Sequence, residues 1–151
     1  MIWYFLRHAK TEREAKSGKD VDRALAPKGI KQCEEMSMHL ASLPIGKVLC
    51  SSAQRTKETA RYCFPTQAIQ YIDSLYLASL EEWRLLVVEQ AADQTLFIGH
   101  NDGISAFITW LTGEFTHLQT AALVTVEFHG SDPALLGPAT ATVRSYYRPV
   151  V

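Results

Sequence analysis

Three short, largely apolar runs, each followed at once by polar or charged residues, constrain the fold of this chain more than any other feature. They occupy residues 2–6, 47–50 and 95–98. Runs of this length with polar residues behind them are typical of strands that are buried on both faces of a sheet. The sequence therefore predicts three strands whose ends all carry polar side chains.

Helical patterns fill the segments between these strands. Pro27 stands at a favoured first helical position, and apolar residues then recur at roughly helical spacing as far as Leu43. Pro44 and Gly46 end this helix. Further expected elements are helices over 53–63, from the N-cap Ser79 to about 91 and near 104–111, and strands near 68–72, 121–128 and 140–147.

Strands that alternate with helices predict an α/β fold. We expect a three-layer α/β/α sandwich, in which helices cover both faces of a mostly parallel central sheet. The 151 residues carry no repeat and no linker, so a single domain over 1–151 is expected. The polar stretch 9–26 is predicted to be a long loop, and a loop of that length inside a compact domain is often functional.

Composition limits the classes of function. The 15 basic and 16 acidic residues give a formal net charge of −1, which argues against a nucleic acid or a membrane surface as partner. The three cysteines form no CxxC pair, so neither a disulfide framework nor a cysteine zinc site is indicated. No signal peptide or membrane span is recognised, and a cytoplasmic protein is expected.

The residues that follow the strands point to phosphate chemistry. Arg7 and His8 follow the first strand, Arg55 comes shortly after the second, and His100 follows the strand at 95–98. Ligands collect at the carboxyl ends of strands in α/β sheets, so these side chains are expected to converge if the strands are parallel neighbours. Arginines match the oxygens of a phosphoryl group, and neutral His8 can attack phosphorus. We expect His100 to be protonated and to donate to a phosphoryl oxygen.

The same motifs resemble those of a known family. Arg7-His8-Ala9-Lys10, the segment 51–60 (SSAQRTKETA) and Gly99-His100-Asn101 are similar, in this order, to the histidine phosphatase superfamily, which is phosphoglycerate mutase-like. The short SixA-type phosphohistidine phosphatases are the most similar group. The resemblance implies transient phosphorylation of His8 within a pocket that also contains Arg7, Arg55 and His100. It implies hydrolysis of a phosphorylated protein, or alternatively of a small phosphorylated metabolite, without a metal or an organic cofactor.

Departures from the family pattern concern the backbone, a helix cap and the general acid. Ala9 replaces a glycine of the commonest motif, and Ala26 replaces a threonine that would cap the next helix. Glu81 and Glu82 are candidates for the acid that protonates a leaving oxygen, although two glutamates in a first helical turn also simply stabilise a helix. A phosphohistidine expels an imidazole and needs such an acid less than a phosphate ester does. A pocket without a dedicated acid would therefore favour N–P bonds.

Other assignments remain open from the sequence. Lys10 could steer anions or lie in solvent, and Asn101 could orient a ligand or cap the helix after it. A cysteine phosphatase based on Cys50 and Arg55 is a rival, but only four residues separate the two and none is glycine. A phosphate-binding module without turnover is a second rival, and a mutase is a third, which so short a chain disfavours. Without a lid domain, an open pocket is expected.

Overall fold

A six-stranded sheet forms the centre of the computed structural model, which describes all residues from 1 to 151. The strand order is β3-β2-β4-β1-β5-β6. Neighbours from β3 to β1 run parallel, whereas β5 is antiparallel to both β1 and β6. The strands are β1 (Ile2–Arg7), β2 (Lys47–Ser51), β3 (Gln70–Ile72), β4 (Thr95–Gly99), β5 (Leu123–Phe128) and β6 (Ala141–Tyr147).

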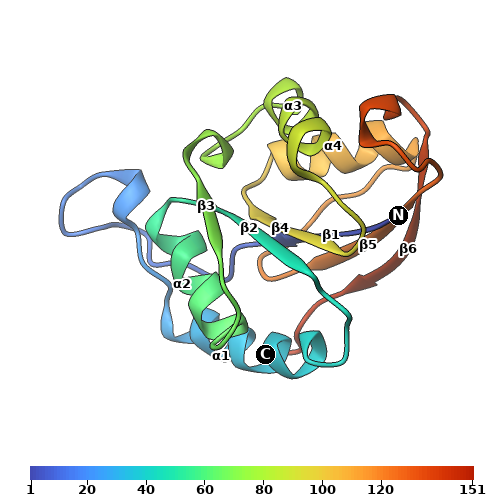
Figure 1. Ribbon diagram of the computed structural model, residues 1–151. Helices are drawn as coiled ribbons and strands as arrows, with labels where there is room; N and C mark the ends of the chain where they lie inside the picture. Colours follow the sequence, from blue (N-terminus) through green and yellow to red (C-terminus); the bar gives the residue numbers. More distant parts are fainter.

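Helices cover both faces of this sheet (Figure 1). The pair α1 and α2 lies on one face, and the pair α3 and α4 lies on the other, as the ribbon shows. The bounds are α1 (Pro27–Leu40), α2 (Gln54–Cys63), α3 (Leu80–Gln90) and α4 (Gly103–Thr112), with short 3-10 turns at Asp20–Asp22, Asp73–Leu75 and Pro133–Leu135.

The position of β1 inside the sheet explains why residues 2–6 are apolar without interruption. Trp3 and Phe5 belong to the hydrophobic cluster beneath α3 and α4, whereas Tyr4 and Leu6 belong to the cluster beneath α1 and α2. Successive side chains of a strand point to opposite faces, so a strand with helices on both sides needs apolar residues at every position. The first run of the sequence is therefore the centre of the molecule.

The predicted α/β/α sandwich with a mostly parallel sheet is confirmed. Ser79 caps α3 through a reciprocal capping box with Glu82, as its position suggested, and Ala26 leaves the start of α1 without a side-chain cap. The first helix ends at Leu40 rather than at Leu43, because the chain turns before Pro44. None of the helices combines the length and the apolar character that crossing a membrane requires.

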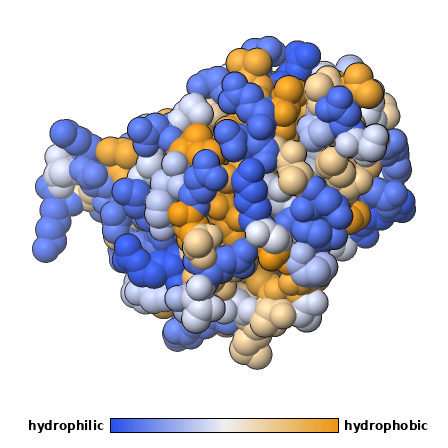
Figure 2. All heavy atoms as spheres, viewed as in Figure 1, coloured by the Kyte–Doolittle hydropathy of each residue, from blue (hydrophilic) through white to orange (hydrophobic).

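The 9–26 loop leaves the body of the molecule next to α1 and α2, at the left of Figure 1. Its surface is mostly hydrophilic in the same view (Figure 2). The backbone carbonyl of Lys10 accepts a hydrogen bond from the N–H of Ala26, and Thr11 and Leu25 form an isolated bridge. The close approach of α1 to this part of the loop requires glycine at residue 29, because a Cβ atom there would lie 2.1 Å from the backbone oxygen of Lys10.

We predict that Gly29→Ala destabilises the protein by about 2 kcal/mol, because the clash with backbone outweighs the gain in helix propensity. The free energy of unfolding in urea measures this. Gly46→Ala is the matched control, since the nearest atom to an added Cβ there is 3.9 Å away. Equal stability of the two variants would contradict the close packing of the loop against α1.

Candidate active site

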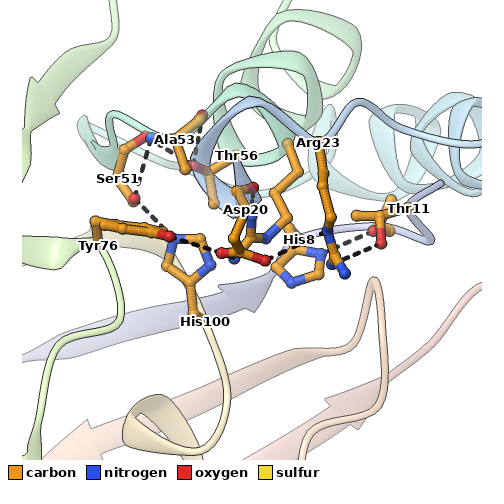
Figure 3. Close-up of polar contacts among 11 residues, drawn as sticks. His8, Thr11, Asp20, Arg23, Ser51, Ala53, Thr56, Tyr76 and His100 are labelled. Atoms are coloured by element: carbon orange, nitrogen blue, oxygen red, sulfur yellow. Dashed lines mark hydrogen bonds and ion pairs between the residues drawn. The ribbon is translucent and has the colours of Figure 1, made fainter. Parts of the chain in front are cut away.

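Strand β4 pairs with β1 on one side and with β2 on the other, which brings the polar residues at the ends of these three strands together. Arg7 pairs with Gly99, and Cys50 pairs with Ile98, so the three strands end at one edge of the sheet. His8 and His100 follow β1 and β4 directly, and their ring centroids are 5.5 Å apart. Figure 3 shows the two imidazoles side by side. The predicted convergence of the strand ends is thus present in the fold.

His8 has the geometry of a neutral nucleophile. The residue is 6% exposed, and its Nδ1 lies 2.8 Å from the carbonyl oxygen of Ala9. A carbonyl only accepts, so Nδ1 carries the proton and Nε2 keeps a lone pair. Burial, helped by the charges of Arg55 and other arginines, lowers the pKa of His8 to about 4. The imidazole is therefore uncharged at neutral pH.

The charges of three guanidinium groups act on this imidazole. Arg7 donates to the carbonyl of Leu118 and Arg23 to the hydroxyl of Thr11, while Arg55 is only 3% exposed. Several buried donors in this cluster have no hydrogen-bond partner within the protein. They are Nε of Arg7, of Arg55 and of Arg23, the last of which lies 3.5 Å from the Asp20 carboxylate, within ion-pair distance. Nδ1 of His100 likewise has no hydrogen-bond partner.

Convergent N–H donors of this kind suit an anion with several oxygens, because guanidinium groups and phosphoryl oxygens are complementary in charge and geometry. Arg23 was not among the residues that the sequence singled out. It lies at the end of the 9–26 loop, where no strand fixes its position in advance. The one available signal was the presence of an arginine inside a long loop that starts at His8.

His100 differs from its predicted state. Burial lowers the pKa of its imidazole to about 3, and the charge of Arg55, together with that of His8 once His8 is protonated, acts in the same direction. The expectation of a protonated His100 is therefore wrong for the free protein, since an imidazolium here would be desolvated beside a guanidinium. A neutral ring still has one N–H, so His100 remains able to donate to a phosphoryl oxygen.

Asp20 is a second residue that sequence reasoning missed. Its backbone oxygen accepts from Arg55 Nη1 at 2.8 Å, and its carboxylate accepts from Arg55 Nη2 at 3.0 Å. The hydroxyl of Tyr76 also donates to this carboxylate, at 2.6 Å. The hydrogen bonds from Tyr76 and Arg55 lower the pKa of Asp20, so the group is ionised.

The low exposure of the two imidazoles differs from the open pocket that the sequence predicted. Asp20 of the 9–26 loop pairs with Arg55 and lies beside His8, the latter as Figure 3 shows. His8 and His100 are left 6% and 2% exposed. Asp20, a residue of the first loop, is therefore part of the candidate site, and both imidazoles are largely withdrawn from solvent in the free protein.

The two candidate acids are engaged elsewhere. Glu82 accepts from the backbone N–H of Ser79 within the helix cap, and Glu81 pairs with Arg84 on the exposed side of α3. Neither carboxylate makes a hydrogen bond or ion pair with the cluster. The structure thus gives both glutamates the helix-stabilising role that the sequence also allowed.

The structure also shows the positions of Lys10 and Asn101, the two residues that the sequence suggested as possible ligand contacts. Lys10 is exposed, and its backbone N–H donates to Gln32. Asn101 does not cap the following helix, because the N-cap is Asp102 and makes no side-chain cap bond. Instead, the Asn101 amide accepts from the hydroxyl of Ser105 and donates to the carbonyl of Leu118. Its side chain therefore holds the loop that also receives Arg7.

The cysteine rival is contradicted by burial. Cys50 is fully buried in β2, and desolvation strongly raises the pKa of its thiol. A thiolate is the form that attacks phosphorus, so a buried and protonated sulfur is not a nucleophile. His8 remains the candidate nucleophile.

Comparison with known proteins agrees with this geometry. Residues 3–114 match the model of the histidine phosphatase superfamily, branch 1. The chain belongs to this family. An uncharacterized protein of Mycobacterium leprae, ML1117, is 31% identical over 124 residues, which cover 80% of this chain and 77% of that protein.

Solved structures of the SixA group are similar over nearly the whole chain. A proposed phosphohistidine phosphatase SixA from Nakamurella multipartitia superposes with a TM-score of 0.85 at 25% identity, covering 99% of this chain and 96% of the other. A further proposed SixA, from Agrobacterium tumefaciens, gives a TM-score of 0.81 at 23% identity, covering 98% and 97%. This histidine phosphatase is therefore SixA-like, and family and fold support phosphatase activity.

The low pKa values of the two imidazoles predict that neither ring titrates between pH 8 and pH 5 in the free protein. Nitrogen-15 NMR of labelled histidine across this range measures the charge state directly. The imidazole of His8 then stays neutral as the pH falls, until it is protonated near pH 4. A titration of His8 near its ordinary value of 6.5 would contradict the desolvated site.

Proposed function

We propose that this protein hydrolyses the N–P bond of phosphohistidine in a protein substrate, with His8 as the transiently phosphorylated group. The observation that carries the proposal is the charge of each group in the cluster around His8. The cluster offers a neutral imidazole, three guanidinium groups and one carboxylate, Asp20, which Arg55 and Tyr76 keep ionised. Such a set binds and attacks a phosphoryl group but supplies no protonated acid to a leaving alkoxide.

In the first step, the lone pair on Nε2 of His8 forms a bond to phosphorus while the N–P bond of the substrate breaks. The leaving imidazole of the substrate carries a proton on its other nitrogen, so it departs as neutral imidazole and takes the electron pair of the broken bond. Arg7, Arg55 and Arg23 would bind the equatorial oxygens, on which the charge of the transition state lies. No proton from the enzyme is needed.

The Ala9 carbonyl matters for the second step. Because it holds the proton on Nδ1, phosphorylation at Nε2 turns the ring of His8 into an imidazolium. A positively charged ring leaves phosphorus readily. Water then attacks phosphorus, and the bond to Nε2 breaks with its electron pair returning to that nitrogen. The ring recovers its neutral form with the Nδ1 proton still in place, and both protons of the water leave with the released dihydrogen phosphate.

Loss of the nucleophile tests this function. We predict that His8→Ala lowers phosphate release from a phosphohistidine peptide by at least about 10³-fold. His129→Ala is the matched control, since this exposed histidine follows β5, whose end pairs with the start of β1, far from the carboxyl end of that strand. p-Nitrophenyl phosphate, assayed in parallel, reports O–P cleavage. Faster release from the ester than from the peptide would contradict the N–P preference.

The Asp20 carboxylate would compete with a bound phosphoryl group for Arg55. We predict that Asp20→Asn tightens the binding of inorganic phosphate about tenfold, because it removes a negative charge from the guanidinium while keeping an acceptor for Tyr76. Isothermal titration calorimetry measures this affinity.

Asp22→Asn is the control for this variant. Asp22 lies in the same 3-10 turn, but its carboxylate accepts from Ser17 and does not contact Arg55. We expect it to leave phosphate affinity unchanged. Weaker phosphate binding by Asp20→Asn would show that Asp20 helps to build the pocket instead of occupying it.

A small phosphorylated metabolite is the second candidate substrate, and one observation favours it. The two imidazoles are only 6% and 2% exposed, and a small substrate reaches such recessed groups more easily than a protein surface does. A panel of phosphorylated metabolites, assayed beside the peptide, separates the two. Phosphate binding without release from any substrate would indicate a module that lacks turnover.

A further inference from the structure

The contacts of His100 indicate a role for Ser51, whose hydroxyl lies within hydrogen-bond distance of its ring. Ser51, the last residue of β2, is fully buried, and its hydroxyl oxygen lies 2.7 Å from Nε2 of His100 (Figure 3). The backbone N–H of Ala53 donates to the same oxygen at 3.3 Å. A hydroxyl has one proton to donate, and the Nε2 lone pair of His100 is the one acceptor that its contacts provide.

The other ring nitrogen of His100 fits this arrangement. Nδ1 is buried and has no hydrogen-bond partner in the protein, and His100 lies beside His8 in Figure 3. If the proton were on Nε2, the serine proton would have no acceptor and Nδ1 would present a lone pair to the phosphoryl oxygens. With the proton on Nδ1, both groups are satisfied once an anion is bound.

We propose that Ser51 is a positioning residue that holds His100 in the tautomer with its proton on Nδ1, so that this N–H donates to the phosphoryl group. The catalytic part of this inference rests on the proposed function. The tautomer itself is a property of the free protein. It requires His100 to be neutral, and the charged or titratable groups that act on it are Arg7, His8, Asp20, Arg55 and Tyr76.

Nitrogen-15 NMR of labelled histidine at pH 7 tests the tautomer without any substrate. In the wild-type protein we expect a protonated Nδ1 and an unprotonated Nε2 on His100. In Ser51→Ala we expect this preference to be lost, and in Ser51→Thr, which keeps the hydroxyl, we expect it to return. A wild-type His100 that is protonated on Nε2 would overturn the proposal even if the alanine variant failed to fold.

Kinetics with a phosphohistidine peptide test the consequence. A donor to a developing charge contributes up to about 10²–10³-fold in rate. Ser51 acts through His100, so we expect kcat to fall about tenfold in Ser51→Ala with little change in KM, and to recover in Ser51→Thr. Ser52→Ala is the matched control, because this neighbouring serine makes no hydrogen bond through its side chain. An unchanged tautomer or an unchanged kcat in Ser51→Ala would overturn the role of Ser51.

The two proposals fail in different ways. A wild-type protein that releases no phosphate from the peptide, while His100 shows the Nδ1 proton and loses it in Ser51→Ala, would refute the function and leave the positioning role of Ser51 standing. Phosphate release that depends on His8 but not on Ser51 would support the proposed function and refute the positioning role of Ser51.

Discussion

Positive charge concentrated around buried imidazoles is the constraint on which this site depends. Arg7, Arg23 and Arg55 act together on His8, and their charges add to the effect of burial on its pKa. The same charges require an anion nearby, because a buried guanidinium without a counter-charge is unfavourable. In the free protein Asp20 meets part of this requirement. The contact of Asp20 in the first loop and part of the lowered pKa of His8 thus both depend on these arginines.

The sheet makes this concentration possible. Residues from β1, β2 and β4 lie at one edge because parallel strands in register end together, and apolar side chains on both faces fix that register. The antiparallel strands β5 and β6 lie to one side of the cluster. Their contribution to the site is indirect: the segment before β5 supplies the Leu118 carbonyl that holds Arg7 and the side chain of Asn101.

The sequence was sufficient for those parts of the molecule that periodicity determines. Continuous apolar runs identified the strands, and the residues at or shortly after their ends led to the prediction that Arg55 and the two histidines His8 and His100 converge, because a strand end has a defined place in an α/β sheet. Asp20 and Arg23 could not be found in this way, since the path of an 18-residue loop follows no period. The charge of His100 could not be predicted from the sequence either, because a pKa depends on burial and on neighbours that are distant in sequence.

The hydrogen bond between the imidazole of His8 and the Ala9 carbonyl has a thermodynamic consequence. It leaves Nε2 as the nitrogen that is free to bond to phosphorus. Under the proposed function, the phosphorylated enzyme would be a phosphoramidate of the same chemical kind as phosphohistidine in a substrate. Transfer from one imidazole to another would then be close to isoenergetic, and most of the free energy of hydrolysis would be released when water attacks. Transfer from an alkyl phosphate would instead run uphill, so the proposed N–P substrate would load this site at the lower cost in free energy.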